Sequence, residues 1–208
     1  MRVLLLDVDE TLYPRGNGVL RRIDARINSF MVDRLGIAAA RVDAERVLLR
    51  DRFGTTLRGL TEQHAIDVDE YLLHCHGVDL SDLLAPDPRL RALLERVPLR
   101  KAVLTNGPRA HALRVLDLLG VADLMECVLA LEDLAYAPKP SPSAYGSALD
   151  RLGVPAEECL FVDDTLAFAR AAAEQGMRAA WVAPPDAPRE AEGVHHVIRD
   201  VHEVEDLL

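Results

Sequence analysis

The chain has 208 residues, a formal net charge of −10 at pH 7 and a pI of about 5.1. This charge repels polyanions, so we exclude a nucleic acid polymer as partner, whereas a small anionic substrate can bind where a metal and a few cations reverse the local sign. Sparse cysteines and an N-terminal apolar run too short for a signal peptide or a membrane span predict a cytoplasmic protein with no membrane partner. The oligomeric state stays open.

The chain opens with an apolar strand at residues 2–6, which is followed at once by Asp7 and Asp9. Alternate residues of an extended chain point the same way, so both carboxylates can face one site at the carboxyl end of the strand. Two acids there suit a metal, or a nucleophile beside an acid/base. The alternative is structural, since an Asp after a strand often caps a helix or starts a turn.

Residues 18–84 contain no clear strand, and their apolar residues recur at helical spacing. Glycine-rich and proline-rich segments punctuate both ends of this stretch. We therefore predict a helical cap at residues 17–85 that sits over the sheet edge, inserted into a catalytic core made of residues 1–16 and 86–208. Predicted cap helices lie near residues 23–31, 42–49, 57–66 and 68–73.

The second half alternates short apolar runs with helical patterns. Strands are predicted near residues 100–104, 127–131, 159–162, 177–182 and 195–198. Helices are predicted at residues 109–119, from a Ser141 cap to residue 152, at residues 165–175 and at the C-terminus. Near-continuous apolar strands separated by helices indicate βαβ units, so the predicted fold is a doubly wound, Rossmann-like α/β core with a parallel sheet.

In a parallel sheet, polar residues that follow several strands gather at one edge. They are Asp7, Asp9, Thr105, Asn106, Lys139 (in the loop before the Ser141 helix), Asp163 and Asp164. This set suits phosphoryl transfer. Asp7 would attack phosphorus, Asp9 would exchange the proton, and Lys139 and Thr105 would bind the phosphate. Mg²⁺ prefers such oxygen ligands and offsets the repulsion between a carboxylate and a phosphate dianion.

Four segments resemble the motifs of the haloacid dehalogenase-like phosphatases: residues 7–14 (DVDETLYP), 104–106 (LTN), 139–140 (KP) and 162–165 (VDDT). The resemblance implies that Asp7 is the nucleophile and Asp9 the acid/base. It also implies Mg²⁺ bound by Asp7, the backbone carbonyl of Asp9 and Asp163, with Asp164 as a further ligand or a nearby acid. One departure is Phe168, where the family often has Asn.

More narrowly, residues 11–14 (TLYP), 53–60 (FGTTLRGL) and His64 are similar to a pyrimidine 5′-nucleotidase-like branch. This resemblance implies a nucleoside 5′-monophosphate as substrate. It makes Arg58 and His64 candidate substrate-binding residues, beside Thr105, Asn106 and Lys139 at the sheet edge. The alternative for the cap residues is an ordinary solvated helix face.

Three other functions remain open at this point. A sugar-phosphate mutase would use the same Asp7 and Asp9 but return the phosphoryl group to the substrate. A dehalogenase needs no metal and typically lacks an acid at the position of Asp9, which argues against it. A binding protein without catalysis has Phe168 as its only support in the sequence.

Overall fold

The computed structural model describes residues 1–208 and contains two compact units. One comprises Met1–Asn17 and Leu80–Leu208, and the other comprises Gly18–Asp79. The second unit falls within the stretch predicted as a cap. Its role as a cap stays a prediction. None of the helices combines the length and the apolar character that a membrane span requires.

The first unit is built on a six-stranded parallel sheet with the strand order β3-β2-β1-β4-β5-β6. The strands are β1 (Val3–Leu6), β2 (Arg100–Leu104), β3 (Cys127–Leu129), β4 (Cys159–Asp163), β5 (Arg178–Val182) and β6 (His196–Ile198). The predicted doubly wound, Rossmann-like fold with a helical insertion is confirmed. After β3 the chain crosses back to β4, so β1 and β4 form the switch point at which such sheets bind ligands.

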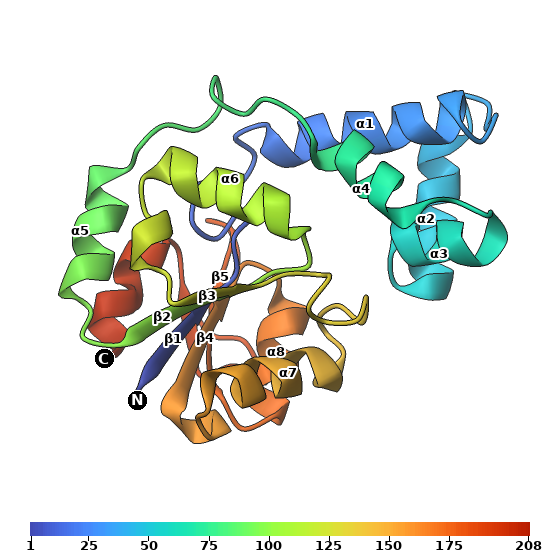
Figure 1. The fold of residues 1–208 in the computed structure, drawn as a ribbon. Helices are drawn as coiled ribbons and strands as arrows, with labels where there is room; N and C mark the ends of the chain where they lie inside the picture. Colours follow the sequence, from blue (N-terminus) through green and yellow to red (C-terminus); the bar gives the residue numbers. More distant parts are fainter. The chain divides into compact units, whose positions relative to one another are not determined.

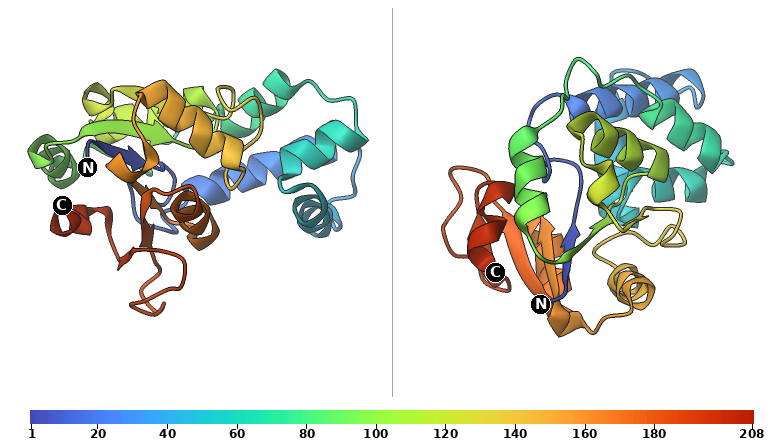
Figure 2. Two further views of the ribbon diagram at one scale, coloured as in Figure 1. Left: turned by 90° about the horizontal axis from the view of Figure 1, so that it is seen from below. Right: turned by 60° about the vertical axis from the view of Figure 1, so that its left-hand side comes forward.

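Helices cover both faces of this sheet (Figure 1). They are α5 (Pro88–Arg96), α6 (Arg109–Leu119), α7 (Pro142–Leu152) and α8 (Leu166–Glu174), with short 3₁₀ turns η1 (Ala122–Leu124), η2 (Ala156–Glu158) and η3 (Val201–Leu207). In β1, Val3 and Leu5 pack with α7 and α8, whereas the alternate residues face the α6 side. Figure 2 shows α5 beside the C-terminal η3, where Arg96 pairs with Glu205 at 2.7 Å.

The structure differs from the predicted elements in three helical segments. Helix α5 was not predicted, although Asp87 caps it by accepting from the backbone of Arg89 and Leu90, and Pro88 begins it. Ser141 occupies the predicted N-cap position of α7, but its hydroxyl makes no capping hydrogen bond and contacts Ser143 Oγ at 2.8 Å instead. The C-terminal helix is a 3₁₀ helix.

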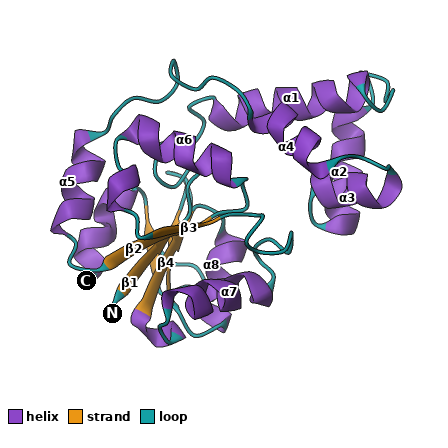
Figure 3. Ribbon diagram, in the orientation of Figure 1, coloured by secondary structure: helices purple, strands orange, loops and turns teal.

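The second unit contains helices and loops but no strand (Figure 3). Its helices are α1 (Val19–Asp33), α2 (Val42–Phe53), α3 (Thr56–Gln63) and α4 (Val68–His76). The helices pack chiefly as two pairs, α1 with α4 and α2 with α3. Between α1 and α4, the rings of Phe30 and Tyr71 meet edge to face at 5.1 Å. This unit therefore has an apolar core of its own.

Candidate active site

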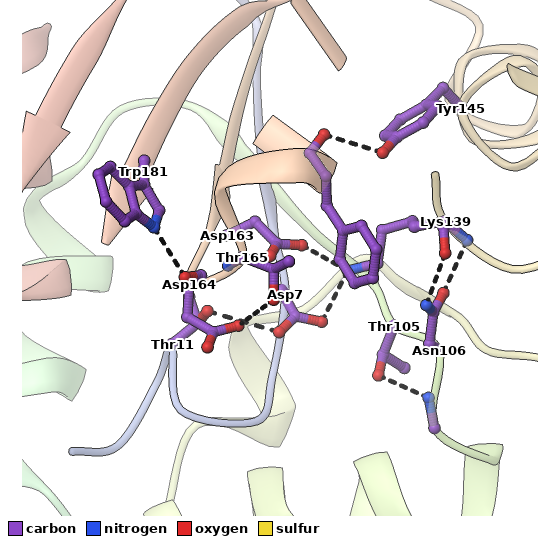
Figure 4. A network of polar contacts seen from close by, with 12 residues as sticks. Asp7, Thr11, Thr105, Asn106, Lys139, Tyr145, Asp163, Asp164, Thr165 and Trp181 are labelled. Carbon is purple, nitrogen blue, oxygen red and sulfur yellow. Dashed lines mark hydrogen bonds and ion pairs between the residues drawn. The ribbon is translucent and has the colours of Figure 1, made fainter. Parts of the chain in front are cut away.

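The centre of the site is a buried lysine between two buried carboxylates (Figure 4). Lys139 Nζ lies 2.8 Å from Asp7 Oδ1 and 2.6 Å from Asp163 Oδ2. Asp7 directly follows β1, and Asp163 ends the neighbouring β4. The parallel register therefore places residues that are 156 positions apart in sequence around a single ammonium group.

Asn106 fixes the loop that carries Lys139. Its side-chain amide donates to the Lys139 carbonyl at 2.9 Å and accepts from the Lys139 backbone N–H at 2.8 Å (Figure 4). Because both ends of the amide are used in this way, Asn106 positions Lys139. Its predicted role in substrate binding stays a prediction.

Two aromatic rings flank the ammonium group of Lys139. The ring centroids of Phe161 and Phe168 lie 5.3 and 5.4 Å from Nζ. Tyr145 donates its hydroxyl to the Phe168 carbonyl at 2.8 Å. Phe168, where the family resemblance would predict Asn, gives Lys139 a cation–π contact that attracts the ammonium group without using its hydrogen-bond donors.

Asp164 completes a carboxylate cluster with Asp7 and Asp163, whose ligand oxygens all lie within 4.8 Å of one another. The Asp164 side chain pairs with Arg15 at 2.8 Å, and its carbonyl accepts from Trp181 Nε1 at 2.8 Å. Oxygen atoms grouped in this way form a ligand set that suits a hard cation such as Mg²⁺.

Burial dominates the electrostatics of this cluster. It raises the pKa of Asp163 to about 7 and that of Asp164 to about 6, against the opposing charges of Lys139 and Arg15 respectively. Burial likewise raises the pKa of Asp7, which Lys139 opposes. Burial lowers the pKa of Lys139, but the charges of Asp163 and Asp7 outweigh it and the net shift is upward. At neutral pH the cluster therefore retains protons that exposed carboxyl groups would have lost.

Thr105 lies next to this cluster at the end of β2. Its hydroxyl is buried and accepts from the Gly107 backbone N–H at 3.0 Å. The backbone N–H of Arg109, at the start of α6, donates to the Glu132 carboxylate at 3.1–3.2 Å. The Arg109 N–H therefore already has a hydrogen-bond partner within the fold.

A family model described as haloacid dehalogenase-like hydrolase matches residues 1–176, a range that includes Asp7, Lys139 and Asp163. The chain belongs to the haloacid dehalogenase-like hydrolases.

Two curated relatives add detail to this haloacid dehalogenase-like assignment. Phosphate metabolism protein 8 of Saccharomyces cerevisiae is 27% identical over 195 residues, covering 85% of this chain and 60% of the yeast protein. A phosphatase of Mycobacterium tuberculosis is 36% identical over 96 residues, covering 44% of each chain. The chain therefore spans less than two thirds of the length of either relative.

Solved structures of haloacid dehalogenase-like proteins share the fold. A HAD phosphatase from Thermococcus onnurineus superposes with a TM-score of 0.71 at 20% identity, covering 100% of this chain and 97% of the other. A 2-haloacid dehalogenase from Pseudomonas syringae gives 0.66 at 22% identity, with the same coverage. Identities this low establish the architecture alone.

In this haloacid dehalogenase-like hydrolase, Asp9 has two hydrogen-bonding partners that its sequence motif did not indicate. Its Oδ1 accepts from the Tyr13 hydroxyl at 2.5 Å and lies 2.8 Å from His111 Nε2. Tyr13 belongs to the segment that resembles the first motif, but His111 is 102 positions away on α6. The sequence did offer one indication of a role for His111. It lies in the first turn of the helix that follows Thr105, and that helix begins at the same edge of the sheet.

The remaining predicted residues lie in the helical unit. Arg58 is exposed on α3, and His64 follows the last turn of that helix, partly buried. Thr55 accepts from the Arg58 backbone N–H at 3.1 Å and caps α3. The substrate contacts expected of Arg58 and His64 stay predictions.

Proposed function

We propose that this hydrolase cleaves small phosphate monoesters through an aspartyl-phosphate on Asp7. The observation that carries the proposal is the buried contact of Lys139 with both Asp7 and Asp163. It holds a carboxylate nucleophile beside a cation that can also bind a phosphate oxygen. Family membership and the phosphatase among the relatives support the same reaction.

The proposed cofactor is Mg²⁺, and the residues present fit it. Lys139 pairs with Asp7 and Asp163, Arg15 pairs with Asp164, and burial raises the pKa of all three carboxyl groups, so an added cation would stabilise their ionised forms. Asp7, Asp163 and Asp164 would hold the ion, with the backbone carbonyl of Asp9 as the family resemblance implies. When bound, Mg²⁺ offsets the charge of the phosphate dianion facing Asp7.

Two displacements at phosphorus make up the proposed reaction. The Asp7 carboxylate attacks phosphorus, the bond to the leaving oxygen breaks, and that oxygen takes its proton from Asp9. A water molecule then attacks the phosphorus, gives a proton to Asp9, and the bond to the Asp7 oxygen breaks. Inorganic phosphate leaves, with Asp7 ionised and Asp9 protonated as at the start. Thr105 and Lys139 bind phosphate oxygens in both steps.

The proposed substrate class is a nucleoside 5′-monophosphate. It rests on the resemblance of residues 11–14 and 53–60 to the pyrimidine 5′-nucleotidase-like branch. Arg58 and His64 would bind the leaving group. A sugar phosphate is the alternative substrate. The proposed cytoplasmic location agrees with the absence of any disulfide among Cys75, Cys127 and Cys159.

The test is a phosphatase screen over nucleoside monophosphates, sugar phosphates and small acid phosphates, with Mg²⁺ and with EDTA. We expect turnover with Mg²⁺ only, and a loss of roughly a thousandfold or more in Asp7→Asn. The matched control is Asp186→Asn, which changes an exposed loop carboxylate and keeps full activity. Full activity of Asp7→Asn would contradict the nucleophile assignment, and a flat substrate profile would discard the nucleotidase proposal while retaining the reaction.

A further inference from the structure

We propose that Tyr13 and His111 are positioning residues that hold the carboxyl group of Asp9 in place for proton transfer. Tyr13 Oη lies 2.5 Å from Asp9 Oδ1, and His111 Nε2 lies 2.8 Å from Oδ1 and 3.1 Å from Oδ2. The inference rests on the phosphatase reaction proposed above and names the groups that make its acid/base effective.

Burial makes these two side chains a rigid support. The His111 side chain is 0% exposed and Tyr13 is 4% exposed, whereas the Asp9 side chain retains 18% exposure. Burial, together with the charge of Asp9, raises the pKa of Tyr13 far above its ordinary value. The tyrosine therefore remains a hydroxyl donor, and an ionised Asp9 accepts from both neighbours.

Local structure fixes each partner. Tyr13 follows a tight turn after β1, in which the Leu12 N–H donates to the Val8 carbonyl at 3.0 Å. The His111 N–H donates to the Pro108 carbonyl at 3.0 Å in the first turn of α6. The two side chains thus reach Asp9 from elements that follow neighbouring strands, β1 and β2.

Gly107 lies close to Asp9 and His111 and also to Thr105, the residue predicted to bind phosphate. A Cβ atom at Gly107 would lie 3.3 Å from His111 Cδ2, 3.4 Å from Thr105 Oγ1 and 3.7 Å from Asp9 Oδ2. The space beside Gly107 is therefore closely packed by three side chains, those of His111, Thr105 and Asp9. A carboxyl held there lies on the side of the site where Thr105 would bind phosphate.

The expected benefit is geometric. Asp9 must donate a proton as the phosphorus–oxygen bond to the leaving group breaks, and must accept one from water in the second step. Two hydrogen bonds restrict rotation of the carboxyl group, so both transfers start from a fixed position. A leaving group that is stable as an anion does not need the first transfer, and this difference supplies the test.

The experiment compares kcat/KM for p-nitrophenyl phosphate and for an alkyl phosphate, because kcat/KM reports the first displacement only. Tyr13→Phe keeps the buried ring and removes the hydroxyl, and His111→Phe removes the other contact. General acid catalysis is worth about 10²–10⁴, so we expect each variant to lose about tenfold or more with the alkyl phosphate. With p-nitrophenyl phosphate we expect a loss below about threefold.

Two comparison variants separate positioning from folding. His111→Gln retains an N–H near the place of Nε2 and should recover most of the alkyl phosphate activity. His196→Phe makes the same change at a histidine that contacts Arg178 away from the site, and should behave as wild type with both substrates. The Mg²⁺-induced rise in Tm should be the same in every variant.

Equal losses with both substrates would overturn the inference, as would a His111→Gln variant that is as impaired as His111→Phe. Loss of the Mg²⁺-induced rise in Tm would also overturn it, because the residues would then act on metal binding. If His111→Phe does not fold, Tyr13→Phe decides the question alone. A wild-type protein that cleaves neither of these esters nor any phosphate in the screen described above would refute the proposed function, and this inference with it.

Discussion

At the scale of single residues, the main feature of the site is that several charged groups are buried together. One buried ammonium, that of Lys139, serves both Asp7 and Asp163, and Asp164 adds a third carboxylate in the same cluster. Because burial disfavours charge, the folded protein holds protons that the same carboxyl groups release when unfolded. The cluster therefore lowers stability at neutral pH in exchange for a site that can bind a cation.

This charge balance predicts a pH effect on stability in the absence of metal. The pKa of Asp163 rises from 3.8 to about 7 on folding. The stabilisation due to its bound proton is thus full below the unfolded pKa and is lost as the pH rises through about 7. Wild type should lose about 1 kcal/mol more than Asp163→Asn between pH 6 and pH 8.

The measurement is denaturant unfolding of both proteins in EDTA at the two pH values. Comparing wild type with the variant cancels the opposite contributions of His74 and His196, whose lowered pKa values favour folding as the pH rises. Mg²⁺ should restore the wild-type stability at pH 8 and have a smaller effect on the variant. Parallel pH profiles of the two proteins would contradict this explanation.

At the scale of elements, helix packing explains some of the residues in the segment 53–60, which resembles the pyrimidine 5′-nucleotidase-like branch. Gly54 adopts a φ of 86° at the end of α2, and Thr55 caps α3. A Cβ at Gly59 would lie 2.6 Å from Leu49 Cδ2 and 2.9 Å from Leu49 Cβ, so α2 and α3 approach closely only because this position is glycine.

Gly59→Ala should therefore destabilise the helical unit by about 1–3 kcal/mol, because the added methyl group overpacks the contact between α2 and α3. The matched control is Gly146→Ala within α7, where a Cβ meets nothing within 4 Å and should stabilise by about 0.5–1 kcal/mol. Thermal unfolding of both variants checks the opposite signs. A tolerated alanine at residue 59 would show that the two helices can separate.

The sequence predicts most of these elements because their apolar periodicity is strong. All six strands and the helices of the insertion occur near the expected residues. Helix α5 was missed because Pro86 and Pro88 suggest a loop, although Asp87-Pro88 is also a helix start. Local pattern alone does not decide between these two uses of proline.

At the scale of the whole molecule, the predicted convergence depends on the parallel sheet. Asp7, Thr105 and Asp163 follow or end three adjacent strands, β1, β2 and β4, and their meeting follows from the strand order. Individual hydrogen bonds do not follow from that rule. Two examples are the paired hydrogen bonds of the Asn106 amide with the Lys139 backbone and the contact of His111 with Asp9. Both depend on loop paths and side-chain rotamers that no sequence spacing specifies.

If Asp7 carries the phosphoryl group during turnover, acid quenching of a reaction with a ³²P-labelled phosphate ester and Mg²⁺ should trap labelled protein. We expect label on the peptide that contains Asp7, removal of that label by hydroxylamine as expected for an acyl phosphate, and no label in Asp7→Asn. Rapid hydrolysis without any labelled protein, or label retained in Asp7→Asn, would contradict this role of Asp7.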